Sequence, residues 1–277
     1  MIAALLRTRQ WYKNLAVFLP VIFAEAAFAE GYLLKVALAF ASLCLLSSAS
    51  YIINDIADAK DDRKHPEKSK RPVAAGRVSA EAALAASLAL LVSGLAVAAQ
   101  LSALFALSAL ALFASTQVYT FFLKRVMFAD IISISTNFVI RAVSGALVIN
   151  VRVSPWLILC TFFLSMFLAA AKRKGDLGLA KNGYTQETAE KLMTFATAAL
   201  VMSYSLYSFL SIYPLLIITL PFAIFVIFSY SHLSDRNKAI ARNPEKALLD
   251  PRIASGIILW VALAFAVVYL KPVTWIF

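Results

Sequence analysis

Apolar residues occur in long runs along this chain, and short stretches with charged residues, proline or glycine separate the runs. Most runs are about 17–21 residues long, close to the roughly 20 residues with which an α-helix crosses the hydrocarbon core of a bilayer. The pattern therefore predicts an all-α, polytopic membrane protein, a bundle of about nine transmembrane helices. The predicted spans are 15–30, 33–53, 80–99, 102–122, 130–150, 154–171, 192–211, 213–231 and 254–270.

Composition agrees with this interpretation. Hydrophobic residues make up 62% of the 277 residues and charged residues 15%, and one soluble domain cannot bury that much apolar surface. We expect a single transmembrane domain over residues 1–277, with longer loops near 55–79 and 172–191. Both cysteines fall inside predicted spans, where a thiol packs as a small apolar group, so no disulfide framework is expected.

Basic residues gather at alternate ends of the predicted spans. Of the 26 Lys and Arg residues, 22 fall on the side that also holds the N-terminus. The positive-inside rule then predicts a multi-pass protein of a bacterial-type cytoplasmic membrane, with its N-terminus in the cytoplasm and its C-terminus outside. The net charge of +11 is therefore concentrated on the predicted cytoplasmic face, where it suits anionic lipids and phosphate ligands. It does not indicate a nucleic-acid partner.

The stretch NDIADAKDDRKHPEKSKRP directly follows one of the most apolar runs. If the second span continues as a helix past Asn54, then Asp55, Asp58 and Asp62 fall within an arc of roughly 60°. Carboxylates grouped in this way suit Mg²⁺, which binds one or two carboxylates together with substrate phosphates. The stretch therefore predicts a magnesium site, with a solvated charged loop as the alternative.

Polar residues continue this stripe into the membrane and beyond the aspartates. Ser47, Ser50 and Tyr51 precede Asn54 on the same face, which indicates a wet cavity and argues against a lipid-facing surface. Lys68 and Arg71 follow the aspartates, where they could meet the remaining charge of a phosphate.

Three other groups of residues are candidates for substrate binding, each with a structural alternative. A charged residue at membrane depth is by default a functional residue or one partner of a buried ion pair. Cations at the end of a helix also interact with the helix dipole or fix the topology. The groups are Asp130, Asn137, Arg141 and Ser144 on one stripe of the fifth span; Lys172, Arg173 and Asp176 after the sixth; and Tyr119 and Lys124 near the end of the fourth.

The motif Asn54-Asp55-x-x-Asp58-x-x-x-Asp62, followed by His65-Pro66-x-Lys68-x-x-Arg71-Pro72, resembles the first aspartate-rich motif of the UbiA superfamily of intramembrane prenyltransferases. The stretches RTRQWYKN, FVIRAVSGALVINVRVSPW and AAAKRKGDL are similar to the phosphoribosyltransferase branch of that superfamily. Most of residues 7 to about 177 share the likeness. One departure separates this chain from the aromatic prenyltransferases: three cations and one carboxylate stand where those enzymes carry a second aspartate-rich motif.

The resemblance implies a Mg²⁺-dependent enzyme of cell-envelope precursor synthesis. It would transfer the 5-phosphoribosyl group of 5-phosphoribosyl 1-diphosphate to a polyprenyl phosphate of the decaprenyl type and release diphosphate. Asp55, Asp58 and Asp62 would hold the metal and act in catalysis. The implied substrate-binding residues are Lys13, Asn14, Asn54, Lys68, Arg71, Tyr119, Lys124, Asp130, Arg141, Lys172, Arg173 and Asp176.

Two alternatives remain open from the sequence. The same aspartates could hold a polyprenyl diphosphate that is transferred to an aromatic acceptor, in which case the lipid is the electrophile. A non-catalytic transporter or lipid-binding protein could instead use the polar stripes as an ion path. Covalent product formation distinguishes both enzymes from the transporter.

Overall fold

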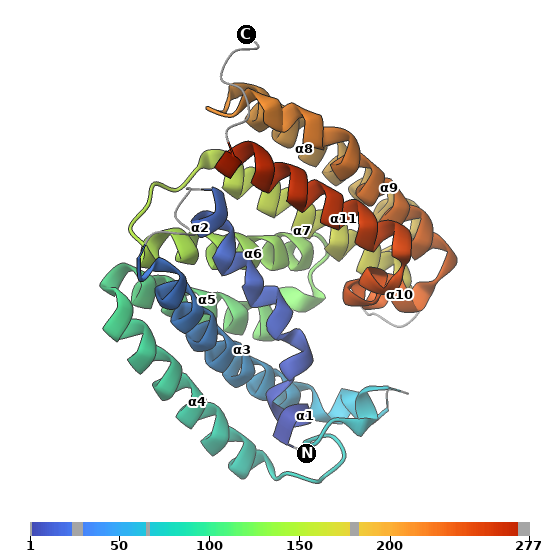
Figure 1. Cartoon of the computed structure of the whole chain (residues 1–277). Coiled ribbons are helices and arrows are strands. Elements are labelled where there is room, and N and C mark those ends of the chain that lie inside the picture. The colour runs from blue at the N-terminus through green and yellow to red at the C-terminus, as the bar shows by residue number, and fades with distance from the viewer. Residues whose placement is uncertain (1, 24–29, 65–66, 178–182, 271–277) are drawn as a thin grey trace. The chain divides into compact units, whose positions relative to one another are not determined.

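The structure is a computed structural model that describes residues 2–23, 30–64, 67–177 and 183–270 (Figure 1). Within these ranges the regular secondary structure is entirely helical, which confirms the all-α fold class. The chain forms two compact units. The first consists of Met1–Lys124 and Asn137–Val153, and the second of Arg125–Thr136 and Ser154–Phe277. The single domain expected over 1–277 stays a prediction.

The helices follow one another with short connections. The first unit holds α1 (Ile2–Leu6), η1 (Thr8–Phe18), α2 (Leu19–Phe23), α3 (Tyr32–Asp62), η2 (Lys68–Lys70), α4 (Ala80–Leu101) and α5 (Ala103–Phe121). Next come η3 (Leu123–Arg125) and α6 (Ala129–Val148), and the two units divide both helices between them. The second unit continues with α7 (Pro155–Gly175), α8 (Gln186–Leu210), η4 (Pro214–Thr219), α9 (Leu220–Arg236), α10 (Lys238–Arg242), η5 (Pro244–Leu249), α11 (Pro251–Phe265) and η6 (Ala266–Leu270).

Eight helical segments in the described residues are long and apolar enough to cross a membrane, close to the expected nine. The second predicted span does continue as a helix past Asn54, because α3 ends only at Asp62. The first predicted span, 15–30, is not among the eight. Its beginning lies in η1 and α2, and residues 24–29 lie outside the described ranges.

Residues with oxygen-bearing side chains cap several of these helices. Ser79 accepts from the backbone N–H of Ala82 at the start of α4, and Thr185 accepts from Thr188 at the start of α8. Such caps satisfy N–H groups that the first helical turn leaves without a partner. Pro155 stands in the first turn of α7, where the absence of an N–H costs nothing.

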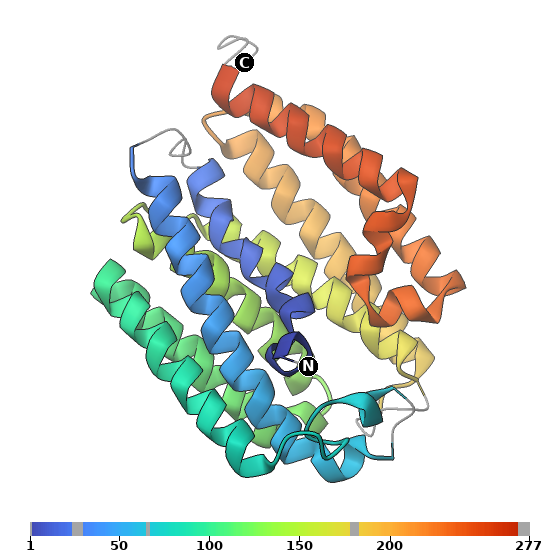
Figure 2. The same ribbon diagram turned by 60° about the horizontal axis from the view of Figure 1, so that its bottom comes forward.

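Helix α3 is the centre of the first unit, and its serines bond to three neighbours. The Ser42 Oγ donates to the Gly94 carbonyl of α4 at 2.8 Å, and the Ser48 Oγ donates to the Leu6 carbonyl of α1 at 2.8 Å. The Ser50 Oγ accepts from the Gln117 amide of α5 at 3.1 Å. Figure 1 shows α4 running beside α3, and Figure 2 shows the blue N-terminal segment alongside α3. In a membrane, apolar side chains contact lipid about as favourably as they contact another helix. Hydrogen bonds of this kind therefore help the helices to associate.

Gly145 of α6 allows η1 to approach very closely. A Cβ atom placed on Gly145 would lie 2.0 Å from the Val17 carbonyl oxygen, which is a backbone atom and cannot rotate away. Close backbone approach at small residues is a common way for membrane helices to pack. The position of η1, which carries Asn14, therefore depends on glycine at residue 145.

Replacing Gly145 by Ala is expected to lower the free energy of unfolding by about 3 kcal/mol, the upper part of the usual range for overpacking. Thermal unfolding in detergent measures the change. Gly94→Ala is the matched comparison, because its closest neighbours are side-chain atoms of Leu46 at 2.9 and 3.2 Å that can shift, and the nearest backbone atom, the Ser42 carbonyl oxygen, is 3.2 Å away instead of 2.0 Å. An equal or smaller loss for Gly145→Ala would contradict the close packing of η1 on α6.

Candidate active site

The three aspartates predicted for the site, Asp55, Asp58 and Asp62, lie along the last two turns of α3. Asp55 and Asp62 are buried, with 1% and 3% of their surface exposed. The Arg71 Nη1 donates to Asp55 Oδ1 at 3.1 Å and to Asp62 Oδ2 at 2.5 Å. Residues seven positions apart share one face of a helix, so a single guanidinium can bridge both carboxylates.

A compact turn holds Arg71 in this position. The Arg71 backbone is extended at the end of η2, and its carbonyl accepts from the Ala75 N–H at 2.8 Å. The next carbonyl, of Pro72, accepts from the Arg77 N–H at 2.9 Å. The Arg63 Nε, just past the end of α3, donates to the Ala74 carbonyl at 3.2 Å. The turn is thereby fastened to the helix that carries the aspartates.

Arg7 is a second partner of Asp55, and the sequence did not single it out. Its Nε donates to Asp55 Oδ2 at 3.1 Å and its Nη2 to Oδ1, a two-pronged contact that fixes both groups. The guanidinium also lies 5.2 Å from the centre of the Tyr51 ring. Burial lowers the pKa of Arg7, and the attraction of the Asp55 carboxylate opposes that change. Arg7 lies between α1 and η1, and its backbone is left-handed, with φ of 50°. From this turn its side chain reaches Asp55.

Asp58 has its own cation. The Lys124 ammonium in η3, just after α5, pairs with Asp58 Oδ1. Both side chains keep about a fifth of their surface exposed, 18% for Lys124 and 21% for Asp58. The sequence named Lys124 and Asp58 separately, and the structure brings them together.

The cluster thus holds three carboxylates against three cations, Arg7, Arg71 and Lys124. Among the described residues, no three His, Cys, Asp or Glu side chains are grouped closely enough to hold a metal by themselves. Carboxylate oxygen is nevertheless a ligand type that suits Mg²⁺, and Mg²⁺ commonly completes its shell with water and substrate phosphate. Asp55, Asp58 and Asp62 are therefore suited to a divalent ion that arrives with a phosphate ligand, not to a metal cage made of protein alone.

A polar layer continues from the aspartates into the membrane-spanning part of the first unit. Arg141 of α6 donates from its Nε to Asn14 Oδ1 at 2.8 Å and from its Nη1 to the Asn137 carbonyl at 2.9 Å. The same Asn14 oxygen accepts from the Ser47 Oγ at 3.2 Å. The predicted stripes of two spans therefore meet at Asn14, a residue of η1.

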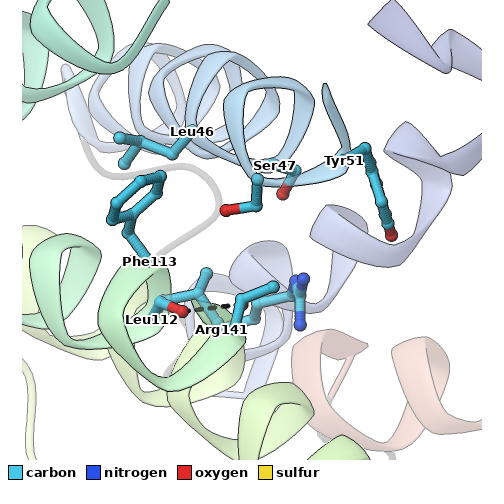
Figure 3. Close-up of a pocket in the computed structure, with 8 residues that line it drawn as sticks. Leu46, Ser47, Tyr51, Leu112, Phe113 and Arg141 are labelled. Atoms are coloured by element: carbon cyan, nitrogen blue, oxygen red, sulfur yellow. Dashed lines mark hydrogen bonds between the residues drawn. The ribbon is translucent and has the colours of Figure 1, made fainter. Parts of the chain in front are cut away.

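Ser47, Tyr51 and Arg141 border one small cavity (Figure 3). Leu46 of α3 and Leu112 and Phe113 of α5 give it an apolar side. A small cavity with one polar and one apolar side thus lies along the polar stripe of α3.

The other residues predicted for this part of the site lie next to the cluster in sequence. Lys68 is exposed on η2, while Asn54 on α3, Tyr119 on α5 and Lys13 on η1 are half-buried. His65 and Pro66, which belong to the aspartate motif, lie outside the described residues. Their roles toward a substrate stay predictions.

Asp130 and Arg173 form a buried ion pair within the second unit. Asp130 is fully buried, and its Oδ2 accepts from the Arg173 Nε at 2.7 Å. Its Oδ1 accepts from the Tyr184 hydroxyl at 2.6 Å. Burial raises the pKa of Tyr184 and the bond to Asp130 adds to the effect, so this hydroxyl remains a donor at neutral pH. Tyr184 was not predicted, because no local pattern connects it to Asp130.

Asp176 and Lys172 lie around the same helix end. Asp176 is 3.9 Å from the Arg173 Nη1 and 3.4 Å from the Arg242 Nε, and Lys172 is half-buried. The contacts of Arg173 and Asp176 agree with the structural alternative given for their group, and the pair with Arg173 agrees with the buried ion pair given as the alternative for Asp130. The substrate-binding roles of all three residues stay predictions.

A sequence profile of the UbiA prenyltransferase family matches residues 17–244. The chain belongs to the UbiA prenyltransferase family. This UbiA-family chain is a transferase with several membrane spans.

Relatives of this UbiA-family chain include two proteins named decaprenyl-phosphate phosphoribosyltransferase. The one from Mycolicibacterium smegmatis is 31% identical, and the match covers 95% of this chain and 91% of the relative. The one from Mycobacterium tuberculosis is 30% identical, with 95% and 92% covered.

A solved UbiA homologue from Archaeoglobus fulgidus, bound to DMAPP and Mg²⁺, has a TM-score of 0.76 to this chain at 22% identity. The match covers 96% of this chain and 98% of the homologue. The likeness shows that this UbiA-family chain has the UbiA fold.

Proposed function

We propose that this chain transfers a 5-phosphoribosyl group from 5-phosphoribosyl 1-diphosphate to a polyprenyl phosphate of the decaprenyl type. The observation that carries the proposal is the identity of about 30%, over 95% of the chain, with proteins named for that reaction. The reaction would serve the synthesis of cell-envelope precursors. The basic clusters favour placement in a bacterial cytoplasmic membrane with the N-terminus and the active site on the cytoplasmic side.

The donor's diphosphate would bind at the end of α3. Asp55 and Asp58, with Asp62, would hold a Mg²⁺ ion together with phosphate oxygens. When bound, the ion would neutralise charge that develops on the diphosphate as it leaves. Arg7, Arg71 and Lys124 now neutralise the aspartates. With the carboxylates turned to the metal, the same cations would bond to the diphosphate oxygens.

The transfer itself breaks the bond between the anomeric carbon and the diphosphate oxygen, and the electron pair leaves with the diphosphate. A phosphate oxygen of the polyprenyl phosphate donates the electron pair of the new bond to that carbon. The attacking oxygen already carries negative charge at neutral pH, so the site needs no strong general base. The work of the protein is then to position two anions and to stabilise the charge on the leaving group.

A transfer assay tests this proposal and its requirement for metal. Purified protein in liposomes, given ribose-labelled donor, polyprenyl phosphate and Mg²⁺, is expected to move label into organic-extractable lipid. EDTA should reduce the rate to background, and excess Mg²⁺ should restore it.

The competing proposal is the transfer of a polyprenyl group from its diphosphate to an aromatic acceptor. It is favoured by the fold shared with a homologue solved with DMAPP and Mg²⁺. If no label enters lipid, while a prenyl diphosphate and an aromatic acid give a product, this competing reaction is the correct one.

A further inference from the structure

Within the described ranges, Arg141 is a buried cation for which no carboxylate partner is found. Only 7% of its surface is exposed, and it lies within the membrane-spanning helix α6. Its recorded contacts are the Asn14 side-chain oxygen, the Asn137 carbonyl and the Phe138 ring at 5.4 Å, all of them neutral. Burying a charge without a counterion is costly, and a charge kept at membrane depth marks a functional site by default.

Lys13, a half-buried residue of η1, is a second cation near Tyr51. Its ammonium group is within hydrogen-bonding reach of the Tyr51 hydroxyl and 6.0 Å from the Tyr12 ring. Over the described part of the chain, neither Lys13 nor Arg141 pairs with a carboxylate. Arg7, Arg71 and Lys124, by contrast, each pair with an aspartate. Among the described residues, the region around Tyr51 therefore carries positive charge that no carboxylate neutralises, and a bound anion would balance it.

This region lies deeper along α3 than the aspartates. Tyr51 precedes Asp55 by about one helical turn. Ser47 precedes Asp55 by eight residues, roughly 12 Å along the helix axis. Arg141 contacts the Asn14 oxygen that Ser47 also contacts, so its guanidinium lies at this deeper level. A water-soluble diphosphate held by the aspartates is thus separated from Arg141 along the helix.

The cavity beside Arg141 has the two-sided lining that a lipid phosphate requires. Ser47, Ser50 and Arg141 form its polar side, and Leu46, Leu112 and Phe113 its apolar side. Figure 3 shows the Arg141 guanidinium and the Tyr51 hydroxyl bordering the same space. The cavity measures about 20 Å³, enough for one water-sized group such as a single phosphate oxygen.

We propose that Lys13 and Arg141 bind the phosphate head of the polyprenyl phosphate acceptor, with Asn14 and Tyr51 orienting it. The inference rests on the proposed function and assigns the two phosphate-bearing substrates to two levels of the first unit. The donor diphosphate occupies the aspartate level, and the lipid phosphate occupies the level of Tyr51 and Arg141. An attacking oxygen then approaches the donor from the membrane side, which is the side from which a lipid enters.

Binding measurements on the purified full chain, in nanodiscs of zwitterionic lipid, test the assignment without turnover. The probes are polyprenyl phosphate, the matching polyprenol, inorganic phosphate, and phosphoribosyl diphosphate with Mg²⁺. Arg141→Gln and Lys13→Gln are each expected to weaken polyprenyl phosphate binding about 10-fold or more, since a charge-assisted bond is lost. Affinity for polyprenol and for the donor should change by less than about twofold. Arg152→Gln and Lys35→Gln, at exposed positions, are the matched controls and should behave as wild type.

Three results would overturn the inference. Unchanged affinity of both variants for polyprenyl phosphate would remove the site. Loss of donor binding, with acceptor binding intact, would assign the two cations to the donor and leave the proposed function standing. Inorganic phosphate binding as tightly as polyprenyl phosphate would identify a general anion site.

One further variant, Arg141→Lys, together with Lys13→Gln, separates a binding effect from a folding defect. Arg141→Lys keeps the charge and is expected to bind polyprenyl phosphate more tightly than Arg141→Gln does. Lys13→Gln changes a half-buried side chain and leaves the contact between Arg141 and Asn14 in place. If wild type binds neither substrate and transfers no label, the proposed function itself has failed.

Discussion

Asp58→Asn is expected to reduce the rate of label transfer by about 100- to 1,000-fold, the usual effect of removing one group that stabilises charge in a transition state. Asn keeps the size of the side chain but loses the negative charge needed to hold a divalent ion beside a diphosphate. Asp58 is the most informative of the three aspartates, because 21% of its side chain is exposed and it pairs with the similarly exposed Lys124. Asp55 is almost fully buried against two arginines, so its replacement would also disturb folding.

Asp61→Asn is the matched control for this variant. Asp61 lies on the same turn of α3 and its side chain is exposed. The control should keep near wild-type activity, and both variants should unfold at the temperature of the wild type within a few degrees. Equal activity of Asp58→Asn and wild type would show that the aspartate cluster is not the metal site.

Asp130→Asn is expected to lower the free energy of unfolding by about 3 kcal/mol, the lower end of the range for breaking a buried ion pair, because the Arg173 guanidinium loses its close partner while the Asp176 carboxylate stays 3.9 Å away. Asp130 is fully buried and Arg173 keeps only 10% of its side chain exposed, so water cannot replace the lost partner. Thermal unfolding of the purified protein in detergent, followed by tryptophan fluorescence, measures the loss.

Glu187→Gln provides the control for the same acid-to-amide change. Its partner is Lys191, four residues along α8, and both side chains are about three-quarters exposed. Such a pair contributes only about 0.3–0.5 kcal/mol. The double variant Asp130→Asn/Arg173→Met should be more stable than Asp130→Asn alone, because it removes the buried charge that has lost its close partner. If the double variant is the less stable of the two, Arg173 has some role other than pairing with Asp130.

Local periodicity was sufficient to predict the helices and the aspartate face. Apolar run length identified the spans, and the seven-residue spacing of Asp55 and Asp62 placed them where one arginine bridges both. The region 15–30 was harder, because the apolar run there reads as one span, whereas its first part lies in the tighter helix η1. A 3₁₀ segment does not have the 3.6-residue period on which the prediction relied.

The partners of the charged residues could not be predicted in the same way. Arg7 and Asp55 are 48 residues apart, and Asp130 and Arg173 are 43 apart, so these pairs form only through packing between helices. The sequence marked Arg71 as a phosphate ligand because it follows the motif, and Arg7 was missed because no local pattern connects it to Asp55. A charge pattern shows which residues need a partner but not which of the available partners they meet.

The contact between Asn14 and Arg141 also constrains how the protein is made. The two residues are 127 positions apart, and at 5–20 residues per second a ribosome needs roughly 6–25 s to travel between them. During that interval the nascent chain holds Asn14 and Ser47 without the guanidinium that later joins them. The first unit can therefore close only after α6 has been inserted, although α3 and its aspartates have been in the membrane since early in synthesis. Assembly of the candidate active site is then a late event in biogenesis. A chain that stops before α6 carries the whole aspartate motif but lacks Arg141.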